Sequence, residues 1–508
     1  MPKKRKQKKE HIKHAQYDGH TFSSLESHPR KGKNLSSPYR KLPNVSFSSW
    51  RDDFLPNMLW AAVLGTTVSR DCYLEFFRKI LGQVRQLERP SERFLTHNYL
   101  AALTDDEFAL VFAPLKESPE ILAAMACLTL LDSLPDSQKW KVFLEISKPE
   151  KDNGILAKAV AATFDHQSEL ATDIRWLKVM TFIVLDRMNF GPQLGETLEE
   201  FRQYPNYGDM RKVRPSIRAT EMFTRETEYG ESLPKSILPF ASEEFWVECR
   251  DKTECYFERD YQDLKLTTSS LMDELTVLAN ELSNHADDVA PHTKTDSKRD
   301  AAFGLASYAI SLCLEAASSP IHSLAGGRIL LRSTVEQMIT LRYLSKKDDE
   351  TIWNQYRNYG VGQAKLSFLK NVREEELPSF ISLDNLHSLA NEDTWMEFLD
   401  INVGPWENLN LRQMSEFADC KVIYDKYYSW ASGFTHAHWA AVRDTVFATC
   451  WNPLHRFHRV LAPARQMPSV LDDMCRLINN MLDDVGMLYP SFKMRIKWHK
   501  IVKTSLES

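Results

Sequence analysis

Residues 323–344 read SLAGGRILLRSTVEQMITLRYL, and the spacing of their apolar side chains decides the fold class. Leu324, Leu331, Val335 and Met338 follow one another at steps of seven, four and three, which places them on one face of an α-helix. Similar spacing recurs along most of the chain, whereas alternation of apolar and polar residues, the pattern of strands, is rare. We therefore predict an all-α protein.

The composition is that of an ordinary soluble globular protein, with 43% hydrophobic and 26% charged residues. A length of 508 residues suggests roughly two to four domains. The stretch 226–241, ETEYGESLPKSILPFA, carries turn residues and little periodicity, so we place a boundary there. The predicted organisation is a disordered arm (1–47), an N-terminal helical domain (48–235) and a C-terminal helical domain (236–508), which makes two helical lobes.

The predicted arm is strongly basic. Residues 1–41 hold twelve Lys or Arg and three acids, a charge of +9, which leaves −14 on the rest of a chain whose formal net charge is −5. One interpretation is contact with nucleic-acid phosphates through the cations of the first nine residues: Lys3, Lys4, Arg5, Lys6, Lys8 and Lys9. The other is a solvated tail that aids solubility or contacts the acidic body of the same chain.

The eight cysteines give no recognisable metal motif. The closest pair, Cys249 and Cys255, has five residues between its members, which is not a usual zinc spacing. We expect reduced, buried thiols in a cytosolic protein, with no cofactor and no metal. The longest uncharged apolar stretch, residues 301–314, is shorter than the ~20 residues that span a bilayer, so we expect no membrane contact.

Three charged side chains share one face of the predicted helix over 321–346. Arg328, Arg332 and Glu336 fall at i, i+4 and i+8, beside the apolar stripe. A charge that leaves water needs a partner, and Arg332 and Glu336 can supply each other. The pair is either a structural ion pair that sets the helix register or an Arg fork, held by Glu336 and directed at phosphate or carboxylate.

The stretch 428–439, YSWASGFTHAHW, contains two closely spaced histidines inside a helix that we predict over 411–447. In a regular helix His436 lies one turn from Ser432. His438 lies about 200° round the helix axis from His436, so the two histidines point to opposite sides and cannot chelate one metal. Three interpretations remain open for His436: a satisfied core histidine, a Ser–His nucleophile pair, and a general acid or base beside the Arg332–Glu336 face. For an enzyme of phosphodiesters, Arg332 would hold phosphate, Glu336 would orient it and His436 would transfer the proton. The catalytic candidates are His436, Glu336, Arg332 and Ser432.

The C-terminal stretch 491–503, SFKMRIKWHKIVK, is predicted to form a short basic amphipathic helix. Its basic stripe consists of Lys493, Lys497 and Lys500. The helix either docks on the body of the protein or contacts nucleic acid or an anionic surface.

Three stretches together resemble a family of uncharacterised bacterial all-helical proteins, a domain of unknown function: SSWRDDFLPNMLWAAVLG (48–65), GRILLRSTVEQMITLRYL (327–344) and YYSWASGFTHAHW (427–439). The resemblance implies a cytoplasmic bacterial protein, and such proteins sometimes occur in accessory or defence gene neighbourhoods. It implies no established reaction. We expect a nucleic-acid-binding or nucleic-acid-cleaving protein with a role in anti-phage defence. The alternative is a non-enzymatic helical scaffold or protein-interaction module in which Arg332, Glu336 and His436 are structural. The sequence does not indicate an oligomeric state.

Overall fold

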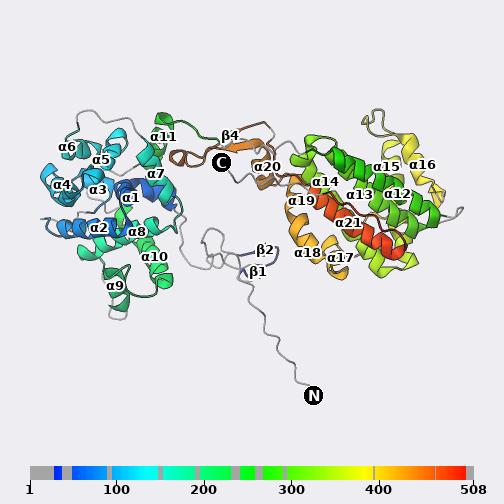
Figure 1. Cartoon of the computed structure of the whole chain (residues 1–508), viewed down its shortest axis with the longest axis horizontal. Helices are drawn as coiled ribbons and strands as arrows, with labels where there is room; N and C mark the ends of the chain where they lie inside the picture. Colours follow the sequence, from blue (N-terminus) through cyan, green and yellow to red (C-terminus); the bar gives the residue numbers. More distant parts are fainter. Residues whose placement is uncertain are drawn as a thin grey trace, which may run out of the picture. The chain divides into compact units, whose positions relative to one another are not determined.

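The computed structural model describes residues 28–36, 49–87, 94–146, 153–188, 195–229, 241–257, 267–289, 295–392, 395–463 and 465–498. These residues are mainly helical, which confirms the all-α prediction (Figure 1). The chain divides into two compact units, Met1–Thr253 and Glu254–Ser508. The helix over 242–252, which the sequence predicts for the second domain, falls in the first unit.

The first unit is built around buried aromatic side chains. Trp60 is fully buried, with its ring edge-on to Phe112 at 5.1 Å and to Phe77 at 6.1 Å between centroids. Its helices, with short 3-10 and π-helical turns labelled η, are η3 (Trp50–Phe54), η4 (Leu55–Met58), α1 (Leu59–Thr67), α2 (Arg70–Val84), α3 (His97–Ala101), α4 (Asp105–Phe112), η6 (Ala113–Glu117), α5 (Pro119–Met125), η7 (Ala126–Leu130), α6 (Ser137–Phe143), α7 (Gly154–Thr163), α8 (Glu169–Val184), α9 (Gly195–Arg202), α10 (Met210–Tyr229) and α11 (Ser242–Lys252).

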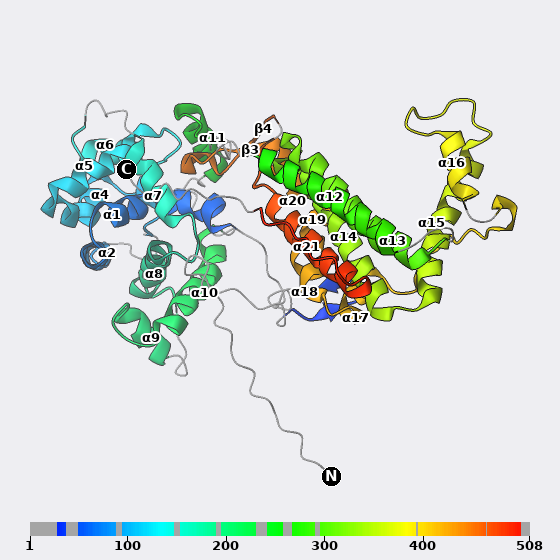
Figure 2. The same cartoon turned by 45° about the vertical axis from the view of Figure 1, so that its right-hand side comes forward.

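The second unit is a bundle of long helices. Figure 2 shows α12, α13, α14 and α21 side by side, and their contacting faces carry the core leucines. On α12 the fully buried positions are Leu271, Leu275, Leu278 and Leu282, at helical spacing. The helices of this unit are α12 (Ser269–Val289), α13 (Ser297–Ala317), η9 (Pro320–Ser323), α14 (Ala325–Lys347), α15 (Glu350–Asn371), α16 (Leu383–Ala390), η10 (Met396–Phe398), α17 (Leu411–Phe417), α18 (Lys421–Ile423), η11 (Tyr424–Tyr428), α19 (Ser429–Thr435), α20 (Trp439–Val446), η12 (Pro453–His455) and α21 (Leu471–Leu488).

One described helix, α13, is long and apolar enough to cross a membrane, judged by length and composition alone. It packs against α12, α14, α15 and α21, and more than half of its most apolar stretch is buried. Ala306, Ala309, Ile310 and Cys313 are among its inaccessible side chains. The contacts are those of a core helix of a soluble protein.

The predicted helix over 411–447 is wrong as a single element. It breaks after Phe417 and again after Thr435, and both breaks have a residue with positive φ nearby: Asp419 at 53° and Ala437 at 49°. After the second break, α20 runs into a short strand, β3 (Phe447–Thr449), which pairs antiparallel with β4 (Arg459–Leu461). These breaks shape the surface on which the candidate site lies.

The predicted C-terminal helix also differs from the structure. Residues 491–498 are not helical, because their backbone bonds to side chains of the bundle instead: Glu274 accepts from the amides of Lys497 and Trp498, and Asn479 bonds to both the amide and the carbonyl of Ile496. In the predicted arm, β1 (Arg30–Lys31) and β2 (Asn34–Leu35) form a hairpin closed at Gly32, whose φ is +58°.

Candidate functional site

The predicted Arg332–Glu336 pair forms on α14, and Tyr428 completes it. Arg332 Nη2 lies 3.0 Å from Glu336 Oε1 and donates to the Tyr428 hydroxyl at 2.9 Å, and that hydroxyl donates to Glu336 at 3.2 Å. The guanidinium also lies over the Tyr428 ring, 4.9 Å from its centroid. Burial, followed by the Glu336 charge, raises the pKa of Tyr428. The three side chains bond to one another, although the buried Nε of Arg332 has no partner among the described residues, and the cluster ties α14 to η11.

Arg328 lies on the same helix but serves a different purpose. Its guanidinium is buried and donates to three backbone carbonyls, those of His322, Leu324 and Pro468. Burial lowers its pKa. Arg328 therefore holds the start of α14 against the chain that leads into α21.

His436 and His438 do not occupy the positions that a regular helix predicts. His436 is the residue at which α19 ends, and the positive φ of Ala437 turns the chain so that the two imidazole centroids lie 6.1 Å apart. Both histidines are exposed, so the interpretation as core residues is wrong. Within the part of the chain that the structure describes, no side-chain hydrogen bond joins Ser432 to His436, or either of them to the Arg332–Glu336 pair.

A cavity of about 360 Å³ opens beside these breaks, between α19, α20 and the β3–β4 pair. Two tryptophans on its wall are half exposed, Trp430 at 54% and Trp451 at 52%. Arg465 is positioned there by its amide, which donates to Thr445 O, and by its guanidinium, which donates to Phe447 O. The lining residues are Trp430, Ala440, Arg443, Asp444, Ala448, Thr449, Trp451 and Arg465.

The segment 430–465 that builds this cavity is basic, although the chain as a whole is acidic. It contains four arginines and one aspartate, a formal charge of +3, against −5 for the chain. A third tryptophan of the segment, Trp439, is 61% exposed. By contrast, Trp60, Trp140, Trp176 and Trp353 are fully buried. Exposed tryptophans concentrated in one basic segment mark an interaction surface rather than a core.

Two cysteines and two histidines meet next to the cavity: Cys255, Cys450, His455 and His458. One atom from each of the four lies within 4.8 Å of the others. Sequence reasoning missed this group because Cys255 and His455 are 200 residues apart. The only local signal is the spacing in CWNPLHRFH (450–458), where two histidines follow a cysteine.

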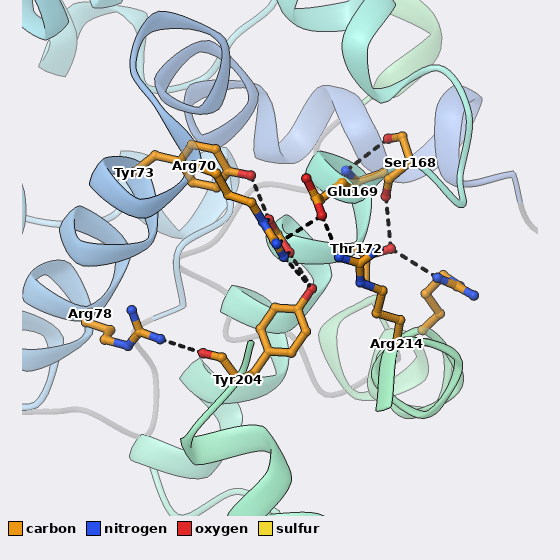
Figure 3. A network of polar contacts seen from close by, with 11 residues as sticks. Arg70, Tyr73, Arg78, Ser168, Glu169, Thr172, Tyr204 and Arg214 are labelled. Atoms are coloured by element: carbon orange, nitrogen blue, oxygen red, sulfur yellow. Dashed lines mark hydrogen bonds and ion pairs between the residues drawn. The ribbon is translucent and has the colours of Figure 1, made fainter. Parts of the chain in front are cut away.

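The first unit has a buried polar network of its own (Figure 3). The Asp173 carboxylate, fully inaccessible, accepts hydrogen bonds from the hydroxyls of Tyr73 and Tyr204 and two from Arg70. Burial, followed by the Asp173 charge, raises the pKa of both tyrosines. The network connects α2, α8 and the chain after α9. Its buried polar groups hydrogen-bond to one another, which indicates a structural role.

Nearby, Glu221 of α10 lies among three buried cations: Arg225 at 2.8 Å, Lys178 at 3.1 Å and Arg175 at 3.6 Å. Burial alone would raise the pKa of Glu221, but the three positive charges outweigh it and lower the pKa to about 2. The guanidinium of Arg225 also lies 3.8 Å from the ring centroid of Phe54. This cluster joins α8, α10 and the WRDDF turn, so it too is part of the scaffold.

Residues 304–449 match a family of unknown function, DUF5677. The match confirms the resemblance to an uncharacterised domain, and the family description names no activity. No curated protein and no solved structure matches significantly. The DUF5677 segment includes Arg332, Glu336 and most of the cavity wall, but it ends one residue before Cys450.

Of the predicted nucleic-acid contacts, two can be placed. Lys493 and Lys497 are exposed on the extended C-terminal stretch. The other predicted contacts lie outside the described residues: Lys3, Lys4, Arg5, Lys6, Lys8, Lys9 and Lys500.

Proposed function

We propose that the second unit binds single-stranded nucleic acid in the cavity between α19, α20 and the β3–β4 pair. The observation that carries the proposal is the pairing of exposed tryptophans, Trp430 and Trp451, with Arg443 and Arg465 on one cavity wall. Every base has a face that can stack on an aromatic ring, and such stacking contributes about 1–3 kcal/mol per base. Arginine suits the phosphates because its planar fork can donate two parallel hydrogen bonds to one group.

The shape and charge of the cavity favour an unpaired strand. A volume of about 360 Å³ is in the range of small-ligand sites, roughly 300–1,000 Å³, and so suits a single nucleotide. A base can enter such a cavity only after it has left its stack. Asp444 adds an acceptor for the amino group of a base edge. Together with Arg443 and Arg465 it gives the cavity lining a formal charge of +1.

The basic arm fits the same proposal as an accessory contact. Its +9 charge would add salt-dependent affinity for phosphates without base preference. The absence of disulfides among the eight cysteines, all within described residues, suits a reducing cytoplasm, which is where we place this binding. A bacterial setting and a role in defence follow from the sequence resemblance alone.

Binding is better supported than cleavage. In the catalytic hypothesis, Arg332 and Glu336 act on a phosphate together with Ser432 and His436. In the structure Arg332 and Glu336 are occupied by each other and by Tyr428. A scaffold without ligand is the remaining alternative, and it predicts that exposed cavity residues can be changed without a binding phenotype.

The test is fluorescence anisotropy of labelled single-stranded RNA and DNA with the full chain and its Trp451→Ala variant. Loss of one stacking platform is expected to weaken binding about 5- to 150-fold, the equivalent of 1–3 kcal/mol. Arg443→Gln is expected to lower the slope of log K against log salt by about 0.7, the share of one phosphate contact.

Trp395→Ala is the matched control, because Trp395 is 73% exposed and lies close in sequence to α16, at the far end of the second unit (Figure 2). It should leave affinity unchanged. Equal affinity of wild type and Trp451→Ala, or tighter binding of duplex than of single strand, contradicts the proposal.

A further inference from the structure

We propose that Cys255, Cys450, His455 and His458 bind one zinc ion in a tetrahedral site. Two thiolates and two imidazoles form one of the usual ligand sets of structural zinc, and their two negative charges balance the ion. The four residues lie outside the DUF5677 segment, and none of them belongs to the Arg332–Glu336–Tyr428 cluster. The zinc site does not depend on the proposed nucleic-acid binding.

The distances between the ligand atoms are those of a coordination shell. Cys255 Sγ lies 3.5 Å from His455 Nδ1 and 3.3 Å from His458 Nε2, and Cys450 Sγ lies 3.3 Å from His455 Nδ1. With Zn–S bonds of about 2.3 Å and Zn–N bonds of about 2.0–2.1 Å at tetrahedral angles, neighbouring sulfur and nitrogen ligands lie about 3.5 Å apart. All four ligand atoms lie within 4.8 Å of one another, so the group is compact enough to surround a single ion.

The backbone brings the distant cysteine to the other three ligands. Phe257 and Cys450 form an antiparallel bridge, and the Trp451 amide donates to Tyr256 O at 2.6 Å. One residue further, the Asn452 side-chain amide donates to Glu254 O at 2.7 Å. Cys255 is thus fixed opposite the turn that carries the histidines.

The turn after Cys450 is bent so that both histidines point back to the thiols. Arg456 and Phe457 have φ of 50° and 53°, a conformation that costs roughly 1–2 kcal/mol for a residue with a side chain. The bend lets the Cys450 amide donate to His458 O at 2.9 Å. Two successive strained residues persist only where surrounding contacts hold the backbone in place, as happens at ligand sites. A metal bound by His455 and His458 would hold this turn in its bent conformation.

Four protein ligands leave no open coordination position, so the ion would be structural rather than catalytic. It would link residues 254–257 to the turn at 450–458. The chain between these two segments, which is most of the second unit, would then form a closed loop. Trp451 follows Cys450 directly, and its ring packs on Phe457 with centroids 5.5 Å apart. The zinc would therefore also hold one wall of the cavity in place.

The test is the metal content of the full chain after expression and gel filtration, measured by inductively coupled plasma mass spectrometry. About one zinc ion per chain is expected, falling to near none in a Cys255→Ser, His458→Ala double variant. Zinc affinity should fall by more than the roughly 10- to 100-fold that loss of an outer-shell partner causes. Cys72→Ser is the control, because Cys72 is also partly exposed but lies outside the cluster, and it should keep the ion.

A second measurement needs no variant. Zinc-bound Cys255 should resist alkylation although it is exposed, and removal of zinc with a chelator should raise its alkylation rate, mapped by mass spectrometry, relative to that of Cys72. Metal-free wild type, a Cys255–Cys450 disulfide, iron or nickel in place of zinc, or a double variant that keeps its zinc would each overturn the proposal.

Discussion

At the scale of single residues, the first unit depends on carboxylates that are buried with their partners. Glu221 is inaccessible, and three cations surround it. A buried ion cluster is weak evidence of net stabilisation, but removal of one member is costly because it leaves charges buried without compensation. The sequence could not indicate this role, because Lys178 and Glu221 are 43 residues apart.

Glu221→Gln should therefore destabilise the first unit strongly. The expected loss is about 3–5 kcal/mol, because Arg175, Lys178 and Arg225 would keep their charges in the interior. Urea unfolding of the full chain at pH 7, with hydrogen exchange of α8 and α10 as the local probe, measures it. Glu196→Gln on the exposed side of α9 is the control and should change stability by less than about 0.5 kcal/mol.

The same carboxylate gives a pH dependence. Its pKa is lowered to about 2, below the value of about 4.3 for an unfolded glutamate. A carboxylate whose pKa is lowered in the folded state contributes stability that is fully present above the unfolded pKa and is lost as the pH falls through the folded pKa. Between about pH 4.3 and 2, the wild type should therefore lose more stability than Glu221→Gln, and parallel losses would contradict the assignment.

At the scale of elements, periodicity predicts helices well where an apolar face is continuous. The helix over 325–347 lies close to the segment predicted over 321–346. Periodicity fails over 411–447, because the spacing of apolar residues does not show where the chain turns. Ala437 has no sequence signal for positive φ, yet its conformation separates α19 from α20 and turns His436 to the surface.

Substitution of Ala437 by glycine distinguishes a continuous helix over 411–447 from a helix that breaks at Ala437. In a continuous helix Ala437→Gly would destabilise by about 1 kcal/mol. At φ of 49° glycine relieves the strain of the left-handed conformation, so stability should be unchanged or slightly higher. Ala437→Val should lower the melting temperature, because a β-branched side chain tolerates positive φ poorly. A glycine variant that melts well below wild type would favour the continuous helix.

At the scale of the whole molecule, the class and the two-unit organisation could be predicted, whereas the candidate site could not. The Arg332–Glu336 pair was predictable because its members are four positions apart on one helix. The cavity and the Cys/His cluster depend on strand pairing and on turns with positive φ. Contacts between segments 200 residues apart leave no periodic trace in the sequence. A usable local signal was the concentration of tryptophans and arginines in 430–465.

The most direct test of nucleic-acid binding is photocrosslinking of an iodouridine-containing single strand to the full chain, with the crosslinked peptides identified by mass spectrometry. Stacking of a base in the cavity predicts crosslinks at Trp430 or Trp451, lost on competition with unlabelled single strand. Crosslinks confined to residues outside 430–465, or none at a concentration at which the strand is bound, would contradict binding in this cavity.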